Sequence, residues 1–251
     1  MAKAEEYISE VLQAFDFGAP VVGAVRYGQG HINDTFVVHT QPEHICCRRF
    51  ILQRISAAAF HHPDQLMENI TGVTEFLGRE IEKNGGDRER EAMRVVRTRT
   101  GGTYYTDSAG SAWRLYPFVE GTVCYQMAET PELFAASGRA FGRFQRLLRD
   151  YPAHTLFETI PHFHDTEDRL AQLKAAVAAD SMGRASECRE EIRFVLDREA
   201  DCSVALQALR DGRLPLRVTH NDTKLNNVLL DKDTGEGVCI IDLDTVMPGL
   251  S

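Results

Sequence analysis

The first half of the chain alternates apolar and polar residues in short runs, a pattern typical of β-strands. Three such runs are expected to form strands, at residues 20–27, 34–40 and 49–55. A glycine turn at 28–30 joins the first two, and this order predicts an antiparallel meander. Further strands are expected at residues 92–98, 102–106 and 112–118.

Helical spacing of apolar residues marks other stretches. Residues 63–77 carry Leu66, Ile70, Val73 and Leu77 on one face, which predicts an amphipathic helix. The first fifteen residues show a similar but shorter pattern. From Pro131 onward helices dominate, and they are expected at residues 131–149, 165–179 and 187–210. Short apolar strands at 228–230 and 238–242, joined by a polar turn, then predict a small hairpin.

The order of elements gives the fold class and the division into lobes. A strand-rich part with one helix precedes a mainly helical part, which is an α+β pattern with a cleft expected between the parts. Pro117 interrupts the last of the early strands. We therefore predict a strand-rich lobe at residues 1–118, beside the expected cleft, and a helical lobe at residues 119–251.

Composition excludes several classes of protein. The 251 residues carry a formal net charge of -9, whereas a nucleic-acid binder normally presents a basic face. We find no apolar run long enough to span a bilayer and no signal peptide, so the protein is expected to be cytoplasmic. None of the six cysteines forms a CxxC pair, which favours free thiols.

The most informative segment is HNDTKLNN at residues 220–227, which fits the pattern H-x-D-x-K-x-x-N of a kinase catalytic loop. Phosphoryl transfer needs a carboxylate near the acceptor hydroxyl, and Asp222 fits that role. Lys224 would supply a cation near the transferred group. Asn227 would offer its amide oxygen to Mg²⁺, which prefers oxygen ligands.

A second acidic motif follows the next apolar run, at residues 240–244 (IIDLD). Phosphoryl transfer requires a second metal ligand, and Asp242 is our choice. Asp244 would lie on the same side of an extended strand and could assist as a further ligand.

The glycine turn between the first two strands is a candidate phosphate-binding loop. Gly28 and Gly30 would let backbone N–H groups approach phosphate oxygens, although a plain hairpin turn fits equally well. Asn33 stands where protein kinases have a third glycine. His31 at the tip would face the nucleotide or the sugar, or else it is an ordinary solvated histidine.

Five segments together resemble one group of enzymes: GQGHINDTF, FILQRI, LMENI, HNDTKLNN and IDLDTVMPG. They are similar to bacterial N-acetylhexosamine 1-kinases, within the aminoglycoside phosphotransferase and choline kinase branch. The resemblance implies a protein-kinase-like bilobal fold with an antiparallel-sheet N-lobe and a mainly helical C-lobe. It also implies that ATP and Mg²⁺ are used to phosphorylate the anomeric hydroxyl of an N-acetylhexosamine.

The resemblance also assigns further nucleotide-binding residues. The strand at 49–55 should supply a cation to the α- and β-phosphates, and Arg54 is expected in that role, as in choline kinases. Because a strand phase is uncertain by one residue, Arg54 could instead be a surface arginine. Glu68, or else Glu75, would be its acidic helix partner. Phe118 and Val119 should hold adenine through their backbone groups.

Two alternatives to a sugar 1-kinase stay open. One is a kinase for another small acceptor, such as an aminoglycoside, choline or homoserine. The other is a nucleotide-binding remnant without catalysis, because the chain ends nine residues after Asp242 whereas the family continues with C-terminal helices. Such a truncation would expose apolar surface and favour self-association.

Overall fold

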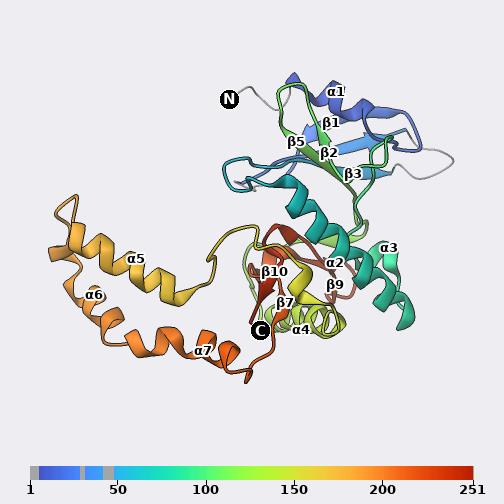
Figure 1. The fold of residues 1–251 in the computed structure, drawn as a ribbon. Coiled ribbons are helices and arrows are strands. Elements are labelled where there is room, and N and C mark those ends of the chain that lie inside the picture. The colour runs from blue at the N-terminus through green and yellow to red at the C-terminus, as the bar shows by residue number, and fades with distance from the viewer. Residues whose placement is uncertain (1–5, 29–31, 42–47, 251) are drawn as a thin grey trace.

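The N-terminal part of the molecule is built on a five-stranded antiparallel sheet. The computed structural model describes residues 6–28, 32–41 and 48–250. The strand order is β1 (Val21–Arg26), β2 (Asp34–Thr40), β3 (Arg49–Arg54), β5 (Ala112–Pro117) and β4 (Tyr105–Thr106). Figure 1 shows helix α1 (Ile8–Gln13) over this sheet and helix α2 (Pro63–Lys83) between the sheet and the second half of the chain.

The register of this sheet decides which side chains face the second half of the chain. Residues directly opposite each other on neighbouring strands share a face. Thr35 pairs with Gln53, and Gln53 pairs with Arg114, so these three lie on one face. Phe36 and Leu52 lie on the other face, in the core cluster that α1 covers.

The second part combines small sheets with helices. Strands β6 (Thr122–Val123), β8 (Val228–Asp231) and β9 (Gly237–Ile240) form a three-stranded antiparallel sheet. Strand β7 (Arg217–Thr219) pairs with β10 (Met247–Gly249). Strand β9 packs against helix α4 (Pro131–Leu147), and short helix α3 (Arg88–Glu91) contacts both β9 and α2. The core here includes α2 side chains, so α2 links the two parts.

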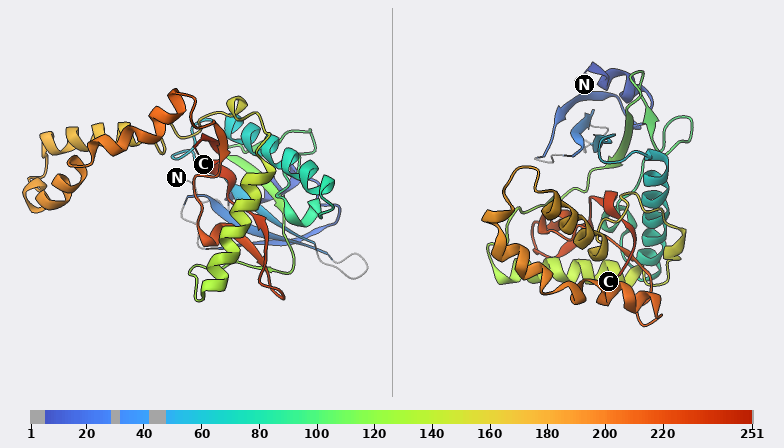
Figure 2. Two further views of the ribbon diagram at one scale, coloured as in Figure 1. Left: turned by 90° about the horizontal axis from the view of Figure 1, so that it is seen from below. Right: turned by 60° about the vertical axis from the view of Figure 1, so that its left-hand side comes forward.

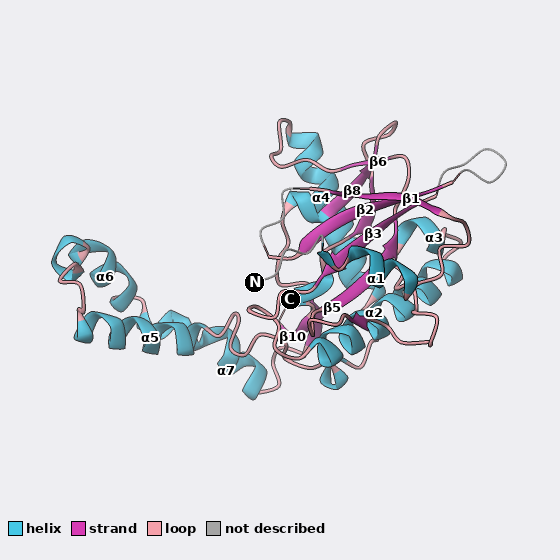
Figure 3. Cartoon of the chain, turned by 90° about the horizontal axis from the view of Figure 1, so that it is seen from above, coloured by secondary structure: helices cyan, strands magenta, loops and turns pink. Residues whose placement is uncertain are grey.

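Three helices extend away from the rest of the molecule. Helices α5 (Thr166–Ala179), α6 (Arg189–Leu196) and α7 (Val204–Arg210) form what we call the arm, which contains only helices and loops. It projects from the body in Figure 1, in the left view of Figure 2 and in Figure 3. The arm helices contribute no residue to either of the two core clusters. Large apolar side chains on and around the arm are exposed: Met182, Phe194, Leu196, Val204, Leu214 and Leu216.

The observed elements confirm the expected α+β fold and correct some boundaries. Residues 34–40 form the expected strand, and the helix expected at 63–77 continues to Lys83. Residues 92–98 are not a strand, since they make only two isolated bridges, from Val96 to Leu115 and from Thr98 to Phe15. The helix expected at 187–210 is broken into α6, a 3-10 turn and α7. Little of that segment is buried, so packing does not hold it as one helix. None of the helices in the described ranges could cross a membrane.

Leu52→Ala is expected to destabilise the protein by about 2–5 kcal/mol, because it opens a cavity in the sheet core. Leu52 is completely buried against α1. Val22 on β1 is 65% exposed, so Val22→Ala should change stability by no more than ~0.5 kcal/mol. Urea denaturation of both variants provides the measurement. Equal midpoints would show that this face of the sheet is not the core described here.

Candidate active site

The catalytic-loop motif begins at a fully buried histidine. His220 follows β7, and its Nε2 donates to the carbonyl oxygen of Ile241 at 2.9 Å. Its Nδ1 accepts a hydrogen bond from the backbone N–H of Asp222 at 3.3 Å. The rings of Phe141 and Phe144 pack edge-on against the imidazole. Burial lowers the pKa of His220, so the ring is neutral and ties the loop to the segment after β9.

This histidine makes stability depend on pH. The folded pKa lies below the unfolded value of about 6.5, so the unfolded state binds more protons in that window and stability falls as the pH drops below ~6.5. One histidine contributes at most about 1.4 kcal/mol per pH unit. His220→Gln should therefore reduce the difference in melting temperature between pH 7.5 and pH 5.5. His154→Gln, at an exposed histidine, is the control, and equal reductions in both variants would contradict the account.

The predicted catalytic residues contact one another directly. The amide Nδ2 of Asn227 donates to Oδ2 of Asp222 at 3.1 Å and to the Asp222 carbonyl oxygen at 2.8 Å. The ammonium of Lys224 lies 2.8 Å from the same Oδ2. Because the Asn227 nitrogen is committed to Asp222, the Asn227 amide oxygen is the atom left to bind a cation.

Asp242 stands beside this group but not on a strand. Strand β9 ends at Ile240, and Asp242 has a left-handed backbone with φ of 60°. The side chain reaches solvent, yet incomplete solvation, together with the negative charge of Asp244, raises its pKa to about 6. Asp222 and Lys224 are near enough for their charges to influence that pKa as well. A carboxylate in such surroundings is stabilised by a bound cation.

Asn227 and Asp242 fit a hard divalent cation. The backbone N–H of Ile241 donates to the carbonyl oxygen of Asn227 at 2.9 Å, which holds the two segments together. Two protein oxygen ligands suit Mg²⁺, because this ion keeps several positions for phosphate oxygens and water. The described part of the chain contains no cluster of three or more His, Cys, Asp or Glu residues that could hold a metal alone.

Asp244 is not placed as the sequence predicted. It belongs to a 3-10 turn, Leu243–Thr245, so it does not share a strand face with Asp242. It is 4% exposed and forms an ion pair with the fully buried Arg114, whose Nη2 donates to Oδ2 at 2.9 Å. The same Oδ2 accepts a hydrogen bond from Asn33 at 2.6 Å. As a direct metal ligand, Asp244 would have to give up these partners.

Sequence reasoning did not identify Arg114. Its Nε and Nη2 donate to the side-chain oxygen of Gln53 at 3.0 and 2.8 Å. Burial disfavours the guanidinium charge, but Asp244 and other neighbours outweigh that cost and raise the pKa of Arg114. An arginine within the apolar strand WRLYP was the available signal, since arginine is seldom fully buried unless it is paired.

Arg54 lies on the sheet face opposite Gln53. It pairs with Asp34, and its Nε is 2.9 Å from the Asp34 carboxylate. The expected pair with Glu68 is not formed: Glu68 is exposed on α2 and makes no hydrogen bond or ion pair among the described residues. Gln53, and not Arg54, is thus the polar residue of FILQRI that shares a face with Arg114. The phosphate-binding role of Arg54 stays a prediction that this placement does not support.

Only part of the glycine turn can be placed. Gly28 has a φ of 77°, a conformation that favours glycine. The side-chain oxygen of Asn33 accepts a hydrogen bond from the backbone N–H of Ser56 at 3.0 Å. Asn33 therefore connects the start of β2 to the segment that follows β3. Gly30 and His31 lie outside the described residues, and their predicted roles stay predictions.

The segment after β5 connects the two parts of the molecule. The backbone N–H of Phe118 donates to the carbonyl oxygen of Arg49 at 2.9 Å. The guanidinium of Arg49 also lies 3.8 Å from the Phe118 ring centroid. The ring centroids of Tyr27 and Phe118 are 5.9 Å apart. The carbonyl oxygen of Val119 accepts a hydrogen bond from Thr122 at 2.8 Å. Tyr27 therefore lies beside Phe118, one of the two residues that the sequence predicts to hold adenine.

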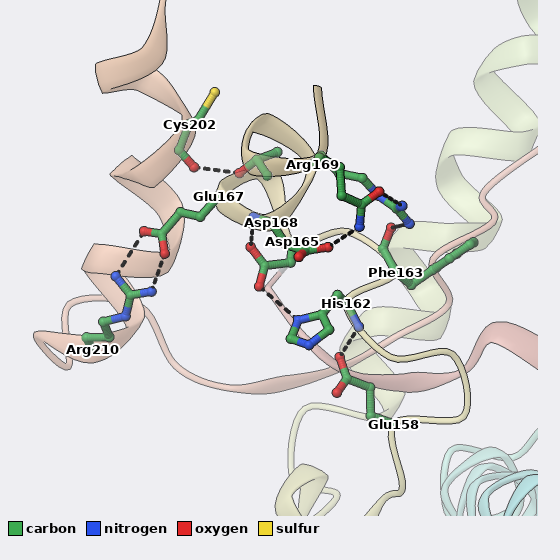
Figure 4. A network of polar contacts seen from close by, with 11 residues as sticks. Glu158, His162, Phe163, Asp165, Glu167, Asp168, Arg169, Cys202 and Arg210 are labelled. Carbon is green, nitrogen blue, oxygen red and sulfur yellow. Dashed lines mark hydrogen bonds and ion pairs between the residues drawn. The ribbon is translucent and has the colours of Figure 1, made fainter. Parts of the chain in front are cut away.

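A polar network fixes the base of the arm next to the catalytic loop. His162 Nδ1 lies 3.2 Å from the Asp165 carboxylate, and the backbone N–H of His162 donates to Glu158 at 3.0 Å (Figure 4). His164 Nε2 lies 2.9 Å from the carbonyl oxygen of Asn221. These histidines therefore have structural partners, and the arm begins beside the catalytic loop.

Comparison with known proteins shows which proteins this chain resembles. Residues 23–250 match the model of the phosphotransferase enzyme family. An amicoumacin kinase in complex with AMP-PNP, Ca²⁺ and Ami is similar over 99% of this chain and 66% of its own, with 16% identity and a TM-score of 0.59. An aminoglycoside phosphotransferase from Alicyclobacillus acidocaldarius is similar over 96% of this chain and 67% of its own, with 16% identity and a TM-score of 0.55.

A further solved structure extends the likeness in fold. It is an aminoglycoside phosphotransferase from Streptomyces rimosus, similar over 98% of this chain and 79% of its own, with 14% identity and a TM-score of 0.52. The present chain thus spans about two thirds of the length of the first two relatives. At these identities the structural likeness shows a shared fold, the protein-kinase-like fold expected from the sequence.

Proposed function

The chain belongs to the phosphotransferase enzyme family, and from this premise we propose that it transfers the γ-phosphoryl group of ATP to a hydroxyl of a small molecule. The observation that carries the proposal is the contact of Asp222 with both Asn227 and Lys224, beside Asp242. A base, a cation and two oxygen ligands are the groups that phosphoryl transfer requires.

In this proposal each residue has one task. Asp222 accepts the proton of the acceptor hydroxyl. At the same time the hydroxyl oxygen forms a bond to the γ-phosphorus, and the bond from that phosphorus to the oxygen of the β-phosphate breaks. Lys224, now 2.8 Å from Asp222, stabilises charge on the transferred group. Asn227 and Asp242 hold the cation, which we take to be Mg²⁺. When bound, Mg²⁺ neutralises negative charge on the nucleotide phosphates.

The nucleotide is proposed to lie between the sheet and the second half of the chain. Phe118 and Val119 would hold adenine, with Tyr27 beside them. The glycine turn would lie over the phosphates. The backbone N–H of Val119 supports this arrangement, because it has no hydrogen-bond acceptor among the described residues.

A sugar is the proposed acceptor, and the anomeric hydroxyl of an N-acetylhexosamine is the proposed site of transfer. The support is the resemblance in the five sequence segments named above. The solved relatives are described as aminoglycoside and amicoumacin kinases, which makes another small acceptor the second candidate. We also propose that the enzyme is cytoplasmic, as the sequence leads us to expect.

A transfer assay with ATP and Mg²⁺ tests this proposal. The acceptors would be N-acetylglucosamine, N-acetylgalactosamine, glucose, kanamycin, choline and homoserine, with products identified by ³¹P NMR. Only the two N-acetylhexosamines should give a product, and it should be the 1-phosphate. Transfer to another acceptor would replace the sugar assignment. Binding of AMP-PNP without transfer to any acceptor would favour a non-catalytic remnant.

A further inference from the structure

A buried polar cluster joins the sheet to the segment that follows β9. We call it the joint cluster and define it by Arg114, Asp244, Gln53, Asn33 and Thr35. Arg114 binds Asp244 and Gln53, and Asn33 binds Asp244. Gln53 also donates to Thr35 at 3.1 Å. The cluster therefore runs across β2, β3 and β5 and ends on a residue two positions after Asp242.

The free energy needed to bury the two charges of this cluster indicates that the cluster does more than stabilise the fold. Arg114 is 1% exposed and Asp244 is 4% exposed, so both charges have lost their hydration. A buried ion pair is weak evidence for stabilisation, because apolar residues of similar volume often do as well or better. Tyr116, on the same face of the strand, is 4% exposed and its ring centroid lies 5.4 Å from the Arg114 guanidinium, so an apolar side chain could pack in this place.

The turn held by Arg114 is also fixed to the catalytic loop. Within the turn Leu243–Thr245, the hydroxyl of Thr245 donates to the His220 carbonyl oxygen at 2.6 Å. The Asn221 side chain donates to the Thr245 carbonyl oxygen at 2.9 Å. Asp242, at the start of this turn, has the left-handed backbone. A non-glycine residue persists in that conformation only where its surroundings impose it.

We propose that Arg114 is a positioning residue, which acts through Asp244 to hold Asp242 where it binds the cation of the nucleotide. In protein kinases, a strand lysine pairs with a helix glutamate to arrange the phosphate site. Here the strand position offers Gln53, the helix acid Glu68 has no partner among the described residues, and the buried ion pair links the sheet to the metal-binding turn. This inference rests on the proposed function.

The test compares nucleotide affinity with and without metal. Calorimetry would give the dissociation constant of AMP-PNP in EDTA and in Mn²⁺, and the ratio of the two is the gain from the metal. The single variant Arg114→Met would leave a buried, unpaired carboxylate and could fail to fold. The double variant Arg114→Met/Asp244→Leu removes both charges and retains volume. Arg139→Met, which breaks an exposed pair with Glu236, is the control.

The double variant should melt near the temperature of the unsubstituted protein. The factor by which Mn²⁺ tightens AMP-PNP binding should nevertheless be 10- to 100-fold smaller, as when an outer partner of a metal ligand is removed. Its affinity for AMP-PNP in EDTA should not change. A gain equal to that of the control would overturn the positioning role. An unsubstituted protein that binds AMP-PNP without any gain from Mn²⁺ would contradict the proposed function itself.

Discussion

Asp222→Asn is expected to lower kcat by about 10²–10⁴-fold, the usual contribution of a general base. The amide cannot accept the proton of the acceptor hydroxyl, and it also loses the charge that pairs with Lys224. Affinity for ATP should change little, because Asp222 faces the acceptor in the proposed mechanism. Steady-state kinetics with N-acetylglucosamine and calorimetry with AMP-PNP provide the two measurements.

Asp233→Asn is the matched control for that experiment. Asp233 is an exposed carboxylate in the turn between β8 and β9, so its substitution alters the net charge equally without touching the loop. The control should retain full activity. Retention of more than about a tenth of the activity by Asp222→Asn would contradict its role as the base.

Asp242→Asn is expected to lower kcat/KM by at least ~100-fold, equivalent to about 2.7 kcal/mol of transition-state stabilisation. The neutral amide keeps an oxygen ligand but removes the negative charge that favours a divalent cation. The Mg²⁺ concentration for half-maximal activity should rise, and excess Mg²⁺ should restore part of the rate. A magnesium titration measures this change, with Asp233→Asn again as control.

A different outcome would separate two roles for Asp242. If the rate fell while the magnesium dependence stayed that of the unsubstituted protein, Asp242 would not be a metal ligand. The joint cluster would then have another purpose, because its proposed task is to position that carboxylate.

Short sequence patterns predicted the features that depend on residues close together in the chain. Strand 34–40 is a short run rich in β-branched and aromatic residues and was predicted at its true boundaries. The contacts among Asp222, Lys224 and Asn227 lie within one loop, so the spacing of HNDTKLNN was enough to bring them together. The spacing of this motif thus predicted the contacts at the centre of the candidate site.

Long-range and phase-dependent features could not be predicted. Arg114 and Asp244 are 130 residues apart, and no periodicity links them. A shift of one residue along a strand moves a side chain to the other face, which is why Arg54 was predicted where Gln53 lies. The apolar run before Asp242 favoured a continued strand, and nothing in that run signals the left-handed turn.

The convergence of Asp222, Asn227 and Asp242 on one nucleotide–metal site is the claim on which the others depend. A crystal structure of the protein with AMP-PNP and Mn²⁺, with the ion located by anomalous scattering, tests it most directly. We expect the ion to be bound by the Asn227 amide oxygen and the Asp242 carboxylate, with Asp222 facing the γ-phosphate. An ion and nucleotide bound elsewhere, with these three side chains free of both, would contradict the account.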